Sequence, residues 1–144
     1  LAHQADSYVA CAIEQDGPYY VWVADAEGHG GPEYSYRLRV GAPRPDFALR
    51  MTPSSLAVAA GHTGVVTVHA LRKDGFAGDI DVSLRSAPEG LVLSGGRIPA
   101  GRDRVLMTLT APWEVYDAPL LVELEGRAEI GAQTVTRPVV PAEE

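Results

Sequence analysis

Two runs of alternating apolar and polar residues, separated by a single turn, constrain the fold of this chain more than any other feature. The first run covers residues 65–73 and the second covers residues 80–86, with Asp74 and Gly75 opening the turn between them. Successive side chains on a strand point to opposite faces, so each run has one apolar face and one mostly polar face. This pattern is typical of an antiparallel sheet that packs one face on a core.

The alternation continues towards the C-terminal end, whereas no stretch repeats apolar residues with the period of a helix. Short predicted strands are separated by turn signals rich in Gly, Pro and Asp, as in sandwiches and barrels. The predicted strands are Tyr8–Glu14, Tyr19–Asp25, Tyr34–Val40, Phe47–Met51, Leu56–Ala59, Val65–Lys73, Ile80–Ser86, Leu91–Ser94, Arg104–Ala111, Leu120–Ile130 and Gln133–Val140.

A proline-rich stretch at residues 41–45, containing Pro43 and Pro45, predicts a boundary between two parts of the chain. Two prolines within three residues remove two backbone donors, so this stretch cannot lie inside a sheet. We therefore predict a segment of residues 1–41, a linker of residues 42–46 and a module of residues 47–144.

The module after the linker is predicted to be an all-β, immunoglobulin-like antiparallel β-sandwich. At least seven strands fall within about 95 residues, which matches the size and strand number of that architecture. We expect Val68, Val82, Leu109 and Val122 to be buried in one core. The inward-facing sets are predicted to be Leu49/Met51, Val66/Val68/Ala70, Ile80/Val82/Leu84, Val105/Met107/Leu109 and Leu120/Val122/Leu124.

The segment before the linker holds three predicted strands, which are too few for a core of its own. Tyr34, Tyr36, Leu38 and Val40 form one apolar face, and that face needs a partner sheet. The partner is either the module or another chain that pairs through an exposed strand edge. We expect another chain or a missing fragment, because the proline linker resists a tight fold-back. A chain that begins at Leu1 is also expected to be a piece of a longer polypeptide.

The same segment carries a family resemblance. Residues 16–25, the loop at residues 28–31 and residues 34–40 resemble the end of a bacterial pre-peptidase C-terminal (PPC) domain. That family typically closes with a Gly-x-Tyr-x-Val-x-Val strand, an Asp/Gly loop and a Tyr-x-Leu-x-Val strand. The resemblance implies the C-terminal strands of a partial β-sandwich that accompanies secreted peptidases and is not itself catalytic.

The remainder resembles the immunoglobulin-like modules that follow PPC domains in large uncharacterised exported proteins of Planctomycetes-like bacteria. The matching stretches are residues 72–78, 87–90, 95–101, 125–131 and 136–143. These stretches are turns and strand ends, so they imply an architecture and supply no catalytic residue. The resemblance also implies a secreted, cell-surface or periplasmic location.

Composition excludes several kinds of partner and bond. The net charge is −7 and no cluster of Lys and Arg occurs, so we expect neither nucleic acid nor an anionic membrane as a partner. No apolar run approaches the ~20 residues of a membrane-spanning helix. Cys11 is the only cysteine, which excludes an intrachain disulfide, and we expect it to be buried as a small apolar side chain.

The spacing of serine, histidine and cysteine residues predicts no catalytic residue and no cofactor. No Gly-x-Ser-x-Gly motif occurs. His3, His29 and His62 fall in predicted loops, and His69 lies on a strand face. None of these residues has the spacing of zinc ligands.

Two acidic stretches are the candidates for a calcium site. Asp25 and Glu27 form one pair, and Asp79 and Asp81 form the other. Carboxylate oxygens are the ligands that calcium prefers, but neither stretch has the Asp-x-Asp-x-Asp-Gly pattern of a calcium loop. We therefore expect these carboxylates to face solvent or to accept hydrogen bonds from turns, with no metal bound.

Aromatic residues give the best indication of binding. In residues 19–23 the strand pattern turns the odd-numbered side chains inward, so Tyr20 and Trp22 point outward together. Trp113 follows a predicted strand and is the third candidate. Exposed aromatic rings can stack on sugar rings or anchor a protein partner.

Three function classes follow from these observations. The first is a non-catalytic extracellular accessory module that acts as a spacer, stabiliser or protein-interaction unit within a larger exported protein. The second is a module that binds a glycan or an extracellular matrix protein through its exposed aromatics. The third is an enzyme, for which the sequence offers no catalytic spacing. We expect the first.

Overall fold

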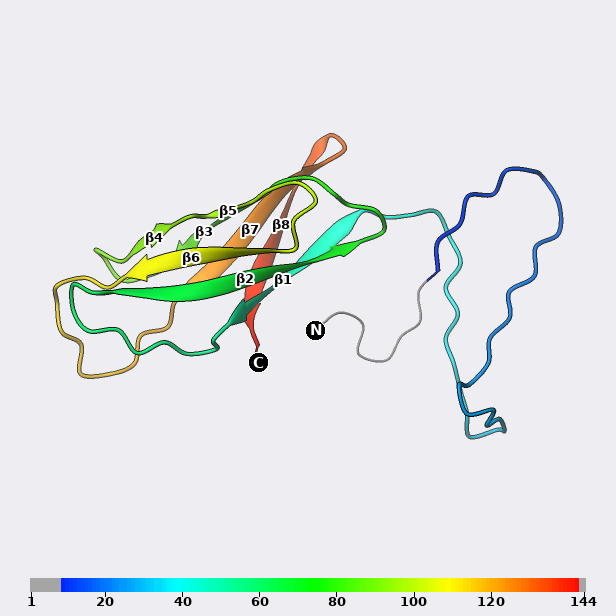
Figure 1. The fold of residues 1–144 in the computed structure, drawn as a ribbon, viewed down its shortest axis with the longest axis horizontal. Coiled ribbons are helices and arrows are strands. Elements are labelled where there is room, and N and C mark those ends of the chain that lie inside the picture. The colour runs from blue at the N-terminus through cyan, green and yellow to red at the C-terminus, as the bar shows by residue number, and fades with distance from the viewer. Residues whose placement is uncertain (1–8, 143–144) are drawn as a thin grey trace. The chain divides into compact units, whose positions relative to one another are not determined.

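The computed structural model describes residues 9–142 and divides the chain into two units, one ending at Ala42 and one beginning at Pro43 (Figure 1). Residues 43–142 contain strands, turns and loops, and no helix. The strands are β1 (Asp46–Thr52), β2 (Thr63–Lys73), β3 (Ile80–Ser86), β4 (Val92–Ser94), β5 (Arg97–Ile98), β6 (Arg104–Thr110), β7 (Glu123–Ile130) and β8 (Gln133–Pro141).

These strands form one curled sheet in the order β4-β6-β2-β1-β8-β7-β3-β5. Figure 1 shows β2 and β6 side by side, with β7 and β8 crossing behind them. The all-β prediction is therefore confirmed. The pairing is mixed rather than purely antiparallel, because β1 and β8 run parallel. The first and last strands are neighbours in the middle of this order, and because they are far apart in sequence no hairpin fixes their relative direction.

The core is one cluster that contains residues from both halves of the strand order. Its largest members are fully buried, as the alternating pattern predicts for one face of each strand. The buried apolar residues are Phe47, Leu49, Val66, Val68, Ala70, Phe76, Ile80, Val82, Ile98, Met107, Leu124 and Ala128.

Two glycines allow the two halves of the sheet to approach closely. A Cβ at Gly126 on β7 would overlap the side chain of Leu49 on β1 and lie 3.1 Å from Ile80 Cγ2. A Cβ at Gly96, between β4 and β5, would overlap the carbonyl oxygen of Val82. Gly96 also accepts a hydrogen bond from the Val82 N–H at 2.7 Å. The chain therefore passes from the β6 half to the β3 half at a point where only glycine fits.

The structure corrects part of the predicted core. Val68 and Val82 are buried, but Leu109 and Val122 are only half-buried. Leu109 lies opposite Gly64, which has no side chain to cover it. Val122 precedes the first residue of β7, so it belongs to the preceding loop rather than to the inward face of a strand.

Three strand assignments also change. The predicted strand Leu56–Ala59 is a loop, whose Leu56 and Val58 side chains lie against Gly64. The predicted strand Leu120–Ile130 begins three residues later, at Glu123. The two-residue strand β5 was not predicted, because two residues carry no readable alternation.

Residues 9–42 form turns and contain no strand, so the strands predicted there are wrong for the residues that the structure describes. Tyr8, which opens the first of them, lies outside those residues. Every residue from 9 to 42 is exposed. A strand requires a neighbour to complete its backbone hydrogen bonds, and the apolar alternation of this segment has no sheet to join in this unit.

Candidate functional site

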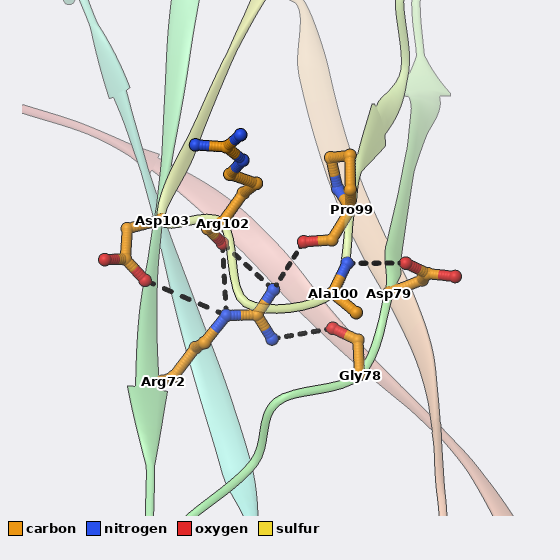
Figure 2. Close-up of polar contacts among 7 residues, drawn as sticks. All are labelled: Arg72, Gly78, Asp79, Pro99, Ala100, Arg102 and Asp103. Carbon is orange, nitrogen blue, oxygen red and sulfur yellow. Dashed lines mark hydrogen bonds and ion pairs between the residues drawn. The ribbon is translucent and has the colours of Figure 1, made fainter.

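The guanidinium of Arg72, on β2, is the centre of the main polar cluster of the second unit (Figure 2). Its side chain is only 12% exposed. Nη1 donates to the carbonyl oxygen of Gly78 at 2.6 Å, and Nη2 donates to that of Pro99 at 3.1 Å. Nε and Nη2 both donate to the carbonyl oxygen of Arg102, at 3.1 and 3.0 Å. The side chain of Arg102 itself points away from the cluster.

Two further contacts hold this guanidinium. Its Cζ lies 5.2 Å from the ring centroid of Phe76, a cation–π geometry. Its Nε lies 3.8 Å from a carboxylate oxygen of the exposed Asp103. The cluster therefore fastens the turn after β2 to the loop between β5 and β6. Because the guanidinium donors already bond to backbone carbonyls, this arrangement is structural.

Asp79 completes the same connection. One of its carboxylate oxygens accepts a hydrogen bond from the Ala100 N–H at 2.6 Å, and the other pairs with Arg97. The hydrogen bond from Arg97, followed by that from the Ala100 N–H, lowers the pKa of Asp79 below its ordinary value of 3.8. A shallow hollow of about 530 Å³ lies beside this loop and is lined by Pro99, Gly101, Arg102, Asp103 and Arg104.

The calcium candidates Asp79 and Asp81 are not brought together as ligands. Asp79 accepts from Arg97 and Ala100, and Asp81 is exposed at the start of β3, opposite Arg127 of β7. Across residues 9–142, no group of three or more His, Cys, Asp and Glu side chains is placed to hold a metal ion.

The other candidate pair lies in a turn of the first unit. One carboxylate oxygen of Asp25 accepts hydrogen bonds from the N–H groups of Glu27 at 3.0 Å and His29 at 3.2 Å. The backbone hydrogen bond from His29 is the main reason why the pKa of Asp25 is lowered from 3.8. The imidazole of His29 lies 3.3 Å from Asp25 and 3.5 Å from Glu27, and it stacks on the ring of Tyr34. These carboxylates therefore organise a local turn.

Two of the three predicted aromatic binding residues lie in the first unit. Tyr20 is 94% exposed and Trp22 is 91% exposed, whereas Tyr19, Val21 and Val23 are between 51% and 58% exposed. The two residues predicted to point outward are thus the more exposed ones. They lie on a segment that forms no strand, so no sheet fixes the direction of their rings.

Trp113, the third candidate, lies in the loop after β6 and is 84% exposed. One side of its indole faces Gly61, where an added Cβ would lie 2.6 Å from two ring carbons. Gly61 has a φ of +70°, which glycine adopts without strain. Trp113 therefore lies on a hydrogen-bonded loop, whereas Tyr20 and Trp22 lie on a segment that forms no strand.

The remaining sequence candidates are dispersed. His62 is exposed and its Nδ1 lies 2.9 Å from the Ala60 carbonyl oxygen, and His69 on β2 lies 3.4 Å from the hydroxyl of the buried Thr52. His3 lies outside the described residues. Cys11 is exposed, so its predicted burial is wrong, because residues 9–42 form no core to bury it in.

Sequence reasoning missed the role of Arg72, although the sequence contains a signal for it. Arg72 follows Val66, Val68 and Ala70 in steps of two, so it falls on the inward face of its strand. A cation on an apolar face must find partners, and the carbonyl oxygens of two neighbouring loops provide them.

No family model matches this chain, and a comparison with curated proteins finds no match. Among residues 9–142, no helix is long and apolar enough to cross a membrane.

Proposed function

We propose that this chain is a non-catalytic accessory module of a larger exported protein, in which it acts as a spacer, stabiliser or protein-interaction unit. The observation that carries the proposal is the apolar surface of residues 9–42. All eleven large apolar side chains of that range are exposed, from Val9 to Val40. A surface of this kind is typical of a region that a partner covers.

The arrangement of the second unit supports an immunoglobulin-like classification as part of this proposal. In an immunoglobulin sandwich, strands A, B, E and D form one sheet and strands C, F and G form the other. With β1 as A and β8 as G, the order β4-β6-β2-β1 corresponds to D-E-B-A, and β8-β7-β3 corresponds to G-F-C. One fold can serve many functions, so this arrangement alone does not assign a role to the chain. The proposal therefore also rests on the first unit.

The first unit supports the PPC-like part of the proposal. The apolar side chains of Tyr34, Tyr36, Leu38 and Val40 alternate with Ser35 and two arginines, as on a strand with one covered face. The described residues contain no neighbour strand for this run. We propose that strands from the parent polypeptide, or from another chain, complete a β-sheet with it. The exported location is part of the same proposal.

Hydrogen exchange tests this proposal on two samples, the chain alone and the chain within its longer parent polypeptide. We expect amides of residues 19–25 and 34–40 to exchange freely in the chain alone and to become protected in the parent. The amides of β2 and β7 serve as the internal reference and should be protected in both samples. Rapid exchange of residues 34–40 in the parent would refute the completed sheet.

A screen of hydrolase substrates with the full chain tests the non-catalytic part. We expect no turnover above that of a heat-denatured sample. Turnover that a single substitution at His62 or His69 abolishes, with folding intact, would show that the chain is an enzyme.

A further inference from the structure

Three loops meet at the end of the second unit that carries Trp113, comprising residues 53–62, 87–91 and 111–122. The Gly61 N–H donates to the Pro112 carbonyl oxygen at 3.0 Å, and the Ala111 N–H donates to the His62 carbonyl oxygen at 2.9 Å. A Cβ at Gly90 would lie 3.1 Å from Pro112 Cβ, so the second loop packs against the same point. Backbone hydrogen bonds and packing thus hold the base of the indole.

The surface around Trp113 is both aromatic and apolar. The hydroxyl of Tyr116 donates to a carboxylate oxygen of Glu114 at 3.2 Å, which positions that carboxylate within the loop. Val115 and Leu121 are 78% and 81% exposed, so the loop presents apolar side chains to solvent that the core does not need. An exposed tryptophan on a loop that backbone hydrogen bonds hold in place, with apolar side chains on the same loop, is a candidate centre of a recognition site.

The charges of these loops have one sign. The three loops contain no Lys or Arg, and they carry the carboxylates of Glu89, Glu114 and Asp117. The pKa of Tyr116 is raised above its ordinary value, first by partial burial and then by the negative charges of Glu114 and Glu89. The nearest arginine along the chain, Arg85 on β3, has its Nε 4.0 Å from Glu123.

We propose that the Trp113 indole, together with the carboxylates of Glu89 and Glu114 on the same group of loops, binds Lys or Arg side chains of a basic protein segment. A cation placed over an indole is attracted by the negative face of the ring, and neighbouring carboxylates add to that attraction. Charge complementarity favours this occupant, because a neutral sugar carries no positive charge to pair with the carboxylates. The inference goes beyond the proposed function, because it involves a different unit of the chain and does not depend on what covers residues 9–42.

Tryptophan fluorescence of the full-length Trp22→Phe variant tests the proposal, because Trp113 is then the only tryptophan. The probe is a short peptide that alternates Gly and Arg, and its control replaces each Arg with Gln. We expect saturable quenching with the Arg peptide that weakens as salt is raised, and none with the Gln peptide. The double substitution Glu89→Gln and Glu114→Gln should weaken binding about tenfold without changing the melting temperature.

Calorimetry with a Trp113→Leu variant supplies the second measurement, since it does not rely on the fluorophore. We expect the Arg peptide to lose all measurable binding to this variant. Equal affinity for the Arg and Gln peptides, or no binding of the Arg peptide at low salt, overturns the proposal. Binding of neutral chito- or cello-oligosaccharides in place of the Arg peptide also overturns it and assigns Trp113 to sugar stacking.

Discussion

Replacing Arg72 with Met would test whether its guanidinium holds together the loops at one end of the second unit. The Met side chain keeps an apolar stem in contact with Phe76 but removes all four hydrogen bonds to the carbonyl oxygens of Gly78, Pro99 and Arg102. The experiment therefore separates the loss of hydrogen bonding from the loss of packing. Arg72→Lys adds a second comparison, because an ammonium retains the charge without the planar fork that reaches two loops.

The expected cost follows from the surroundings of each bond. The bond to Gly78 is partly buried, and a hydrogen bond from a charged donor contributes about 1.5–3 kcal/mol. The bonds to Pro99 and Arg102 are exposed, so hydrogen bonds to water replace much of their contribution to stability when they are lost. We expect the free energy of unfolding to fall by about 2–4 kcal/mol in total. For a unit of about 100 residues this lowers the melting temperature by roughly 10–20 °C.

Thermal and urea unfolding of the full-length variants provide the measurement. Arg85→Met is the matched control, because Arg85 is 61% exposed and makes one long ion pair with Glu123. It should change the free energy of unfolding by less than about 0.5 kcal/mol. Two results would refute the argument that the guanidinium hydrogen bonds hold these loops together. One is a change in the free energy of unfolding of Arg72→Met within that same margin, and the other is an Arg72→Lys variant as stable as the unmodified chain.

Three other perturbations have expected outcomes that unfolding experiments check. Gly126→Ala should destabilise by about 1–3 kcal/mol, because its Cβ would overlap the buried Leu49; an unchanged melting temperature would mean that Leu49 can move aside. Val68→Ala should cost about 1.5–3 kcal/mol and the half-buried Val122→Ala clearly less, and equal costs would contradict the observed core. Asp79 has a lowered pKa, so its bonds stabilise the fold above pH 3.8 and are lost as the pH falls below that value. In the Asp79→Asn variant, the free energy of unfolding should therefore fall less steeply as the pH is lowered below 3.8, and the same pH dependence as in the unmodified chain would contradict this.

Alternation predicted the second unit well where a strand pairs with a long neighbouring strand. Val66, Val68 and Ala70 on β2 and Ile80 and Val82 on β3 are buried as expected, and Leu84 is partly buried. A shift of one residue would expose every member of such a set. The same pattern failed at residues 19–25 and 34–40. An alternating pattern indicates that a segment can join a sheet. A strand also requires a neighbouring strand, and the described residues provide none at residues 19–25 and 34–40.

The candidate sites were predictable only in part, for a related reason. The sequence identified Trp113 as an aromatic residue in a loop. Its contact with Gly61 was not predictable, because Gly61 is 52 positions away in sequence and lies next to Trp113 only because β2 pairs with β6. The carbonyl acceptors of Arg72 are likewise invisible in sequence, because any residue type supplies a carbonyl. Loop geometry rather than residue type determined both arrangements.

The two ends of the second unit differ in how their loops are stabilised, and this difference separates structure from recognition. At the end near Arg72, a charged side chain bonds backbone carbonyls of two loops, so its polar groups are largely occupied by the fold itself. At the end near Trp113, backbone hydrogen bonds and packing join the loops, and the side chains of Trp113, Val115 and Leu121 remain exposed to solvent. Side chains that the fold does not use are available to a partner. A mutational scan should therefore reduce stability mainly at the first end and binding mainly at the second.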